Sequence, residues 1–196
     1  TRATRAVLTT EGDPAEEQWG EHNPRVKFFA MRAHLISTNR GDSNQEGFRF
    51  CPECWAIENT QDDYLTKQHT RPVPKTPIQC SGLAVEGIAL GTRFLTDVLL
   101  LRVRVDDPLK LSPANTNTII ALKTVCDALS QAGSTVLLDR STNEIQANFR
   151  AALTPNGRDG REVEIYLYDT LDGGAGFTKD LSVRLDEMFE NALKIL

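Results

Sequence analysis

The sequence predicts an α/β or α+β fold, with a mixed central sheet, flanking helices and a small lobe inserted near the N-terminal part. Three observations lead to this prediction. Alternating apolar and polar residues indicate strands near residues 96–105 and 162–171. Apolar residues recur at helical spacing in 114–133 and 178–196. The stretch 48–82 holds three cysteines and a histidine but few large apolar residues, so it lacks the material for an ordinary core.

The composition sets the limits of the prediction. A chain of 196 residues can build one sizeable core or two small domains, and 40% apolar with 25% charged residues is ordinary for a globular protein. The sequence contains no apolar run long enough for a membrane span and no signal-peptide pattern, which predicts a cytoplasmic protein without membrane contact. The net charge of −5 argues against a general nucleic-acid coat, although a local basic face is compatible with it.

The first residues are polar and rich in Gly and Pro. We predict that 1–27 is an irregular arm or the tail of a longer chain, cut at an end that carries no initiator Met. The remainder, 28–196, is predicted to be a single domain. Strands are expected in 26–38 and 48–50, with a turn at 39–47 where Asn, Gly, Asp and Ser cluster.

From residue 83 the chain is more regular. Two strand-like stretches are expected in 83–105, on either side of 91–94, followed by a helix that Gly133 would end as a C-cap. We expect strands flanking a turn in 134–154 and a hairpin-type loop at 155–161. A strand at 162–171 then runs through a glycine-rich turn into a C-terminal helical segment.

The cysteines and the histidine of the stretch 48–82 have the spacing of a metal site. Cys51 and Cys54 form a C-x2-C pair, which places two thiolates on one tight turn, and His69 and Cys80 follow after 14 and 10 intervening residues. Zinc accepts Cys3His in tetrahedral structural sites, and four protein ligands leave no open position for catalysis. The sequence therefore predicts a structural Zn2+ that stabilises a lobe at 48–82.

Other roles are open for these residues. Cys51 and Cys54 could instead form a thioredoxin-type redox pair, although that motif normally opens a helix. His69 could be a surface histidine. The other two histidines, His22 and His34, lie outside the cysteine loop, and Cys126 lies on an apolar helical stripe where core packing is expected.

A second feature is the sequence YDTLDGGAGF at residues 168–177. Its residues of interest are Asp169, Gly173, Gly174 and Gly176. A strand, a glycine turn and a helix N-terminus can present backbone N–H groups to an anion. The sequence has neither the Gly-Lys-Ser/Thr of a Walker loop nor the G-x-G-x-x-G spacing of a dinucleotide site. The simpler explanation is a tight strand-to-helix turn that uses glycine for positive φ angles and close packing.

Acidic and basic residues supply two further hypotheses. Asp139, Glu144 and Asp169 could hold Mg2+ in a metal-dependent nuclease, which is the alternative to a non-catalytic protein. Basic side chains that could contact phosphates occur in the cysteine loop and on the strands, and they are Lys67, Arg71, Lys75, Arg93, Arg102 and Arg104. Solvated charged faces account for the same residues, and a pure protein-interaction module is a third possibility.

Three motifs together resemble a known family. EGFRFCPECWAIE with its downstream His and Cys, IALGTRFLTDVLLLRV and EIYLYDTLDGGAGF are similar to the C-terminal zinc-binding domain of MrfA-type superfamily 2 helicases. The same domain occurs in DrmB, a subunit of the DISARM antiphage system, and was long catalogued as a domain of unknown function. The resemblance runs from about residue 28 onward and is most specific at 91–99 and 168–177.

The resemblance implies a non-catalytic module that works beside or within a DNA-translocating ATPase. Its zinc ligands map onto Cys51, Cys54, His69 and Cys80, and a superfamily 2 helicase or ATPase is the implied partner, with DNA as a further contact. Such a module would serve DNA repair or antiviral defence. Family members often continue into another cysteine cluster, whereas this chain stops at NALKIL, so we expect a trimmed fragment or a shorter subfamily.

Overall fold

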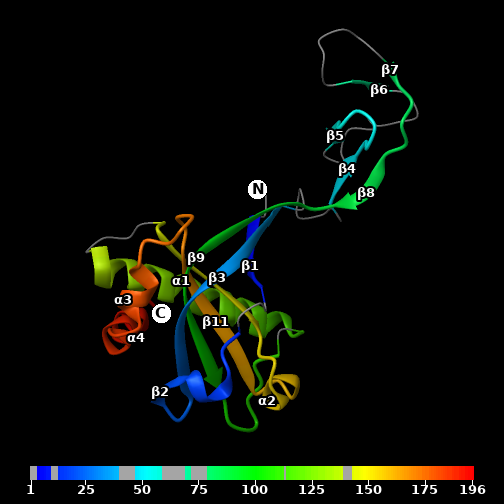
Figure 1. The fold of residues 1–196 in the computed structure, drawn as a ribbon. Helices are drawn as coiled ribbons and strands as arrows, with labels where there is room; N and C mark the ends of the chain where they lie inside the picture. The colour runs from blue at the N-terminus through cyan, green and yellow to red at the C-terminus, as the bar shows by residue number, and fades with distance from the viewer. Residues whose placement is uncertain are drawn as a thin grey trace. The chain divides into compact units, whose positions relative to one another are not determined.

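The computed structural model describes residues 4–9, 13–39, 47–58, 69–71, 79–112, 114–138 and 143–196. The chain divides into two compact units (Figure 1). The smaller unit comprises Thr1–Val7 and Ile36–Arg93, and the larger unit comprises Leu8–Leu35 and Phe94–Leu196. The division at residue 28 and the lobe boundaries at 48 and 82 stay predictions.

The main sheet has six strands in the order β1-β3-β9-β11-β10, with β2 paired to β3. Its strands are β1 (Thr4–Leu8), β2 (Gly20–Asn23), β3 (Val26–Asn39), β9 (Leu90–Arg104), β10 (Ile145–Ala151) and β11 (Glu162–Asp169). β11 lies antiparallel between β9 and β10, so that Ile165 faces Leu101 on one side and Phe149 on the other. Of the two predicted fold classes, α+β is therefore confirmed.

Helices cover one face of this sheet in the larger unit. They are α1 (Thr116–Leu138), α3 (Phe177–Leu181) and α4 (Leu185–Ile195), and α1 packs against β10, α3 and α4. The predicted alternation in β11 is correct, because Val163, Ile165 and Leu167 point into this helical core. All eight residues of β11 are buried, so the strand is covered on both faces.

The predicted C-cap at Gly133 is wrong, because α1 continues through it to Leu138. The helix takes up residues 134–138, where a strand was expected. Gly133 is buried, and a Cβ atom on it would lie 2.8 Å from Cδ1 of Leu181, which is itself fully buried. The glycine lets α1 approach α3 closely. Tertiary packing therefore explains a glycine that local sequence patterns predict to be a helix C-cap.

The opposite face of the sheet in the larger unit carries buried charge. Glu164 has a side chain only 2% exposed and lies between the guanidinium groups of Arg102 and Arg150, at 2.9 Å and 2.8 Å. Arg102 extends the series to Glu16, and Arg150 extends it to Asp13. Opposite charges therefore alternate across this face in the series Asp13, Arg150, Glu164, Arg102 and Glu16, and each member of the series has a partner of the other sign.

Two segments that the sequence predicts as irregular contain structure. The range 1–27 includes β1, β2 and the short 3-10 helix η1 (Glu16–Gln18), because its residues pair with β3 and bind the charged face of the sheet. The loop at 155–161 contains the short helix α2 (Pro155–Arg158), capped by the hydroxyl of Thr154, which accepts a hydrogen bond from the N–H of Gly157. It joins β10 to β11, so the hairpin connection itself is as expected.

The smaller unit is built from short strands. β4 (Phe48–Phe50) pairs with β5 (Ile57–Glu58) and β8 (Val85–Ile88), and β6 (His69–Thr70) pairs with β7 (Gln79–Cys80). Its buried cluster consists of Cys51, Ala56 and Cys80, with Cys54 and Ala84 packed against it. These small side chains bury much less apolar area than the core of the larger unit. Most of the predicted turn at 39–47 lies outside the described residues.

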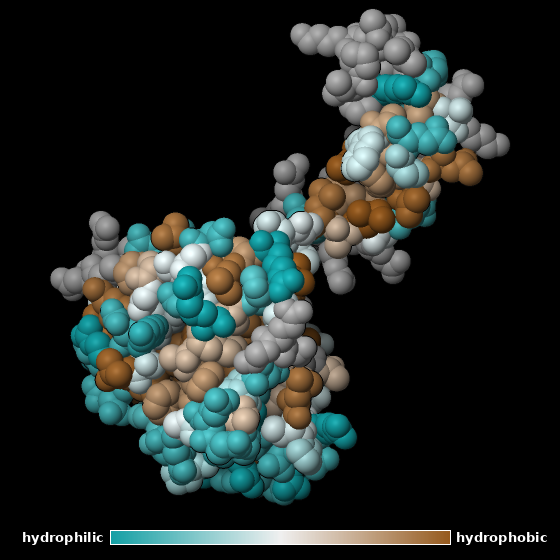
Figure 2. Space-filling view, in the orientation of Figure 1, coloured by the Kyte–Doolittle hydropathy of each residue, from teal (hydrophilic) through white to brown (hydrophobic). Residues whose placement is uncertain are grey.

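None of the helices in the described ranges is long and apolar enough to cross a membrane. The visible face of the larger unit intermixes hydrophilic and hydrophobic residues, as Figure 2 shows.

Candidate metal centre

Cys51 and Cys54 lie on a tight turn that follows β4. The N–H of Trp55 donates to the carbonyl of Cys51, and the N–H of Cys51 donates to the carbonyl of Ala56, both at 2.9 Å. Trp55 has a φ angle of 65°, in the left-handed region, which reverses the chain within these few residues. The turn brings the two thiols to the same side, as the C-x2-C spacing predicts.

His69 and Cys80 come from a different part of the chain. They are directly opposite each other in the antiparallel pair β6 and β7. Side chains at opposite positions of such a pair project from the same face, with Cβ atoms about 5 Å apart. The strand pair therefore places one imidazole and one thiol side by side. The spacing of His69 and Cys80 in the sequence does not by itself predict this pairing.

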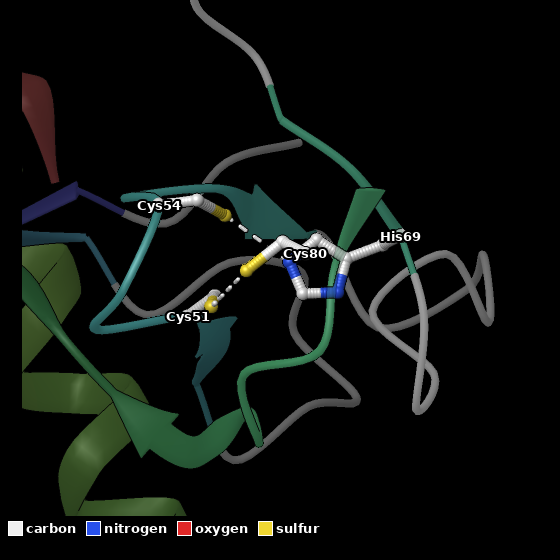
Figure 3. A group of neighbouring side chains, drawn as sticks. All are labelled: Cys51, Cys54, His69 and Cys80. Atoms are coloured by element: carbon white, nitrogen blue, oxygen red, sulfur yellow. Dashed lines mark hydrogen bonds between the residues drawn. The ribbon is translucent and has the colours of Figure 1, made fainter. Parts of the chain in front are cut away.

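The four side chains point toward one another (Figure 3), and their ligand atoms all lie within 4.8 Å of each other. Sγ of Cys51 is 3.8 Å from Sγ of Cys80, and Sγ of Cys54 is 3.1 Å from Nε2 of His69. In a tetrahedron with zinc–sulfur bonds of about 2.3 Å, two sulfur atoms are about 3.8 Å apart. The Cys51–Cys80 distance matches that geometry, and the group is close enough to hold a metal ion.

Burial and hydrogen bonds act on the thiols in opposite directions. Burial raises the pKa of Cys51, but hydrogen bonds from the backbone N–H groups of Cys54 and Glu53 and from neighbouring thiols outweigh it and lower the pKa to about 7. Burial is the main cause that raises the pKa of Cys54, and the neighbouring Cys51 adds to it. The environment therefore favours one thiolate in the group, which is the form that binds metal.

A redox pair fits this arrangement less well than a metal site. The cysteines are not joined by disulfides, and the turn leads into strand β5 rather than into a helix. A thioredoxin-type motif places its first cysteine at a helix N-terminus, where the helix dipole lowers the thiol pKa. Cys54 instead contacts the imidazole of His69, as a neighbouring metal ligand would.

Gly82 packs directly behind the cluster. A Cβ atom on it would lie 2.8 Å from Sγ of Cys51, and its N–H donates to Sγ of Cys80 at 3.5 Å. The pattern of cysteines and histidine in the sequence gives no sign of this supporting residue, because its role depends on close approach in space.

The glycine-rich turn is occupied by the chain's own carboxylate. Asp169 is fully buried, and its Oδ2 accepts hydrogen bonds from the N–H groups of Ala175 and Phe177 at 2.7 Å and 3.1 Å. Its Oδ1 accepts from the N–H of Thr178 at 3.0 Å. The predicted presentation of backbone N–H groups is present, and the anion that they bind is Asp169 itself.

The three glycines of the turn have positive φ angles of 91°, 73° and 83°, as the tight-turn explanation requires. A Cβ atom on Gly174 would lie 2.1 Å from a carboxylate oxygen of Asp97, so this position also needs close approach. The N–H of Gly176 donates to Oδ2 of Asp97 at 3.1 Å. Arg32 also binds this turn, because its guanidinium forms an ion pair with Asp97 and donates a hydrogen bond to the carbonyl of Gly173.

The two most specific motifs of the sequence form one hydrogen-bonded junction. The hydroxyl of Thr96 donates to the carbonyls of Asp169 and Leu171, at 2.8 Å and 3.2 Å. The N–H of Gly173 donates to the carbonyl of Leu95 at 2.7 Å. The segments 91–99 and 168–177 are therefore joined through Leu95 and Thr96, a pairing that local sequence patterns do not predict.

The nuclease hypothesis receives no assembled site from the described residues. Asp139 lies outside them, and Glu144 is exposed. Asp169 uses both carboxylate oxygens to accept backbone hydrogen bonds, so it has little capacity left for a metal ion.

Of the predicted basic residues, Arg102 and Arg104 line one pocket. Lys67 and Lys75 lie outside the described residues, Arg71 is half-buried, and Arg93 is exposed. Arg102 is only 12% exposed, and its guanidinium lies 4.0 Å from the ring centroid of Trp19 as well as against two carboxylates. Arg102 is therefore a structural cation rather than a free phosphate contact. Arg104 is exposed and has no ion pair among the described residues.

The fold is that of part of a known helicase. No family model matches the sequence. The structure is similar to the crystal structure of the DUF1998 helicase MrfA bound to DNA, with a TM-score of 0.51 and 11% sequence identity. The similarity covers 97% of this chain and 20% of that chain. This agrees with the predicted resemblance to MrfA-type helicases at the level of fold.

The sequence is also similar to part of a much longer bacterial protein. It is 32% identical over 211 residues to Druantia protein DruE of Escherichia coli (strain UMEA 4076-1). The alignment spans 100% of this chain and 11% of DruE, so the chain corresponds to about one ninth of that relative's length.

Proposed function

We propose that the chain is a non-catalytic, zinc-stabilised accessory domain of a helicase-type antiphage defence or DNA repair system. It contacts a superfamily 2 motor partner or domain and nucleic acid. The observation that carries the proposal is the convergence of Cys51, Cys54, His69 and Cys80 in a chain that aligns over its whole length with Druantia protein DruE.

Zinc is the metal that this ligand set fits. Three thiolates and one imidazole are soft and intermediate donors, which zinc accepts in tetrahedral sites, whereas Mg2+ and Ca2+ need oxygen ligands. Four protein ligands complete the coordination shell, so the ion has no position left for a substrate or a reactive water. The metal's role is then to hold β4, β6 and β7 together in a unit whose own apolar cluster is small.

The motor function belongs outside this chain. The sequence has no Gly-Lys-Ser/Thr motif for binding nucleotide phosphates, although its fold is found in a helicase. ATP hydrolysis and translocation are therefore assigned to a partner or to another part of a longer polypeptide. Similarity to Druantia protein DruE favours a defence system over DNA repair, while membership of DISARM and equivalence to DrmB remain predictions from the resemblance.

Metal analysis of purified protein tests the ligand assignment. We expect one zinc per chain by mass spectrometry of the metal content, and less than one in Cys80→Ser. Cys126→Ser is the matched control, because Cys126 is buried in the core of the larger unit, and it should keep full zinc. A protein without zinc, or full zinc in Cys80→Ser, would show that the assignment is wrong.

Zinc removal tests the structural role. We expect a strong chelator to abolish protection from hydrogen exchange at 48–58 and 79–88 while β10 and β11 keep theirs, because only the larger unit has a substantial apolar core. Equal loss in both units would contradict a role confined to the smaller one.

A further inference from the structure

We propose that a pocket in the larger unit, formed by the turn between β2 and β3, the end of β9 and α2, binds a backbone phosphate of a nucleic-acid strand. The inference rests on the proposed contact with nucleic acid and names the site for it. These elements meet at one end of the larger unit (Figure 1), which is strongly hydrophilic in Figure 2.

The pocket has a volume of about 400 Å3 and is lined by more cations than carboxylates. Its charged lining residues are Arg25, Lys27, Arg102, Arg104, Glu16 and Glu162. Arg25, Lys27 and Arg102 each form ion pairs, with Asp106, with Glu16, and with Glu16 and Glu164, respectively. Among the described residues, Arg104 is the lining cation without an ion pair. Cationic concave sites concentrate field lines and attract anions.

Arg104 is the cation available to a ligand. It lies directly across the antiparallel ladder from Glu162, the nearest carboxylate expected to neutralise it. Glu162 is turned to other partners, because Oε2 accepts from the hydroxyl of Thr154 at 2.6 Å and Oε1 accepts from the side-chain amide of Asn156 at 3.1 Å. Within the described part of the chain, Arg104 therefore has no ion pair, and its guanidinium can donate to an incoming oxygen.

The other cations shape the pocket. Arg102 is fixed by Glu164 and Glu16 and by its contact with the ring of Trp19, so it contributes a rigid positive wall. Arg25 pairs with Asp106 at 2.7 Å, but both side chains are more than 60% exposed. Exposed ion pairs are worth about 0–1 kcal/mol, so a phosphate can compete for Arg25 at little cost.

A phosphate fits this arrangement better than a carboxylate ligand does. Arg104 and Arg25 are both exposed and line one pocket, so two guanidinium groups can donate to a tetrahedral anion with several oxygens. Because both are accessible from solvent, a strand that passes along the surface can place one phosphate in the pocket. The pocket lining includes no aromatic side chain for base stacking, so contact with the backbone is the expected mode.

The test measures binding of a fluorescent single-stranded DNA by anisotropy at several salt concentrations, with the whole chain loaded with zinc. We expect Arg104→Gln to weaken binding roughly five- to tenfold and to reduce the slope of log affinity against log salt by about one. Arg104→Lys should retain most of the affinity. Lys123→Gln is the charge-matched control, because Lys123 is exposed on α1 and does not line the pocket, and it should bind like wild type.

A titration of inorganic phosphate into 15N-labelled protein separates the pocket from the DNA contact. We expect the amide signals of Arg25, Arg104 and Asn156 to shift with phosphate in wild type and not in Arg104→Gln. DNA binding that Arg104→Gln and Lys123→Gln leave equally strong would overturn the pocket while the proposed nucleic-acid contact stands. Phosphate shifts without any DNA binding would overturn nucleic acid as the ligand, and the absence of both would overturn the pocket and the contact together.

Discussion

The carboxylate of Asp169, at the end of β11, accepts a hydrogen bond of 3.0 Å from the backbone N–H of Thr178 in α3. Two further N–H groups of the same turn donate to its other oxygen. One buried side chain therefore organises the whole strand-to-helix connection. Its carboxylate accepts the N–H hydrogen bonds that the turn would otherwise offer to an anionic ligand.

Replacement of Asp169 by Asn should destabilise the larger unit. An amide offers one acceptor oxygen, and its NH2 group would face backbone donors, leaving buried N–H groups unpaired. We expect the free energy of unfolding to fall by about 3 kcal/mol, measured by urea denaturation. Asp172→Asn is the matched control in the same turn, because Asp172 is exposed, and its effect should lie within about 0.5 kcal/mol. Similar losses in both variants would contradict the role assigned to Asp169.

The charged face of the sheet gives a second comparison. Glu164→Gln removes the carboxylate between two largely buried guanidinium groups, and we expect a loss of about 3 kcal/mol. Glu16→Gln also removes a partner of Arg102, but Glu16 is 61% exposed, and exposed pairs contribute about 0–1 kcal/mol. Chemical denaturation of the two variants at the same pH measures the difference. An equal loss of unfolding free energy in Glu16→Gln and Glu164→Gln would show that burial does not determine how much these ion pairs stabilise the fold.

Gly82→Ala tests the packing behind the metal cluster. The added methyl would lie 2.8 Å from Sγ of Cys51 and 3.0 Å from Cδ of Glu53, so the ligand or the backbone must move. We expect zinc affinity to fall about 10- to 100-fold, as measured by competition with a chromogenic chelator. Gly91→Ala serves as the control, because its Cβ would meet its nearest atom, a backbone oxygen of Ser37, at 3.3 Å. Unchanged affinity in Gly82→Ala would show that the cluster can adjust freely.

The buried thiol of Cys126 should make the free energy of unfolding depend on pH in the alkaline range. Burial, with a contribution from Asp127, raises the pKa of its thiol from 9.0 to about 12. Above pH 9 the unfolded chain loses this proton while the folded chain keeps it. The stabilising contribution is therefore complete below pH 9 and is lost progressively as pH rises toward 12.

The comparison with Cys126→Ala isolates this effect from the other titrating groups. We expect the difference in unfolding free energy between wild type and Cys126→Ala to shrink by about 1.4 kcal/mol between pH 7 and pH 10. Denaturation curves across that range measure it. A difference that stays constant with pH would mean that the thiol ionises equally in both states.

Several features of the fold could be predicted because they depend on neighbours in the sequence. The period of two in β11 and the helical spacing in α1 and α4 reflect which faces are buried, and both were predicted correctly. The turn that carries Cys51 and Cys54 follows from their spacing. The positive φ angles at Gly173, Gly174 and Gly176 follow from the freedom of glycine.

Other features could not be predicted from the sequence, because they depend on contacts between residues that are distant in the chain. Gly133 lies inside α1 and does not end it. Its missing side chain leaves room for the side chain of Leu181. Arg102 has the sequence pattern of an exposed strand residue, yet Glu16, Trp19 and Glu164 enclose it. The opening segment forms strands because the sheet and its charges supply partners that the segment itself does not contain.

The sequence by itself determined the candidate metal ligands, the main strands and helices and the positive φ angles of the glycine turn. These depend on spacing, periodicity and residue type within short stretches. Only the tertiary structure decided that His69 faces Cys80 across a strand pair, that Asp169 occupies its own glycine turn and that Arg104 is left without an ion pair among the described residues. The register between strands sets these relationships, because it brings together residues whose separation along the chain carries no information about their distance in space.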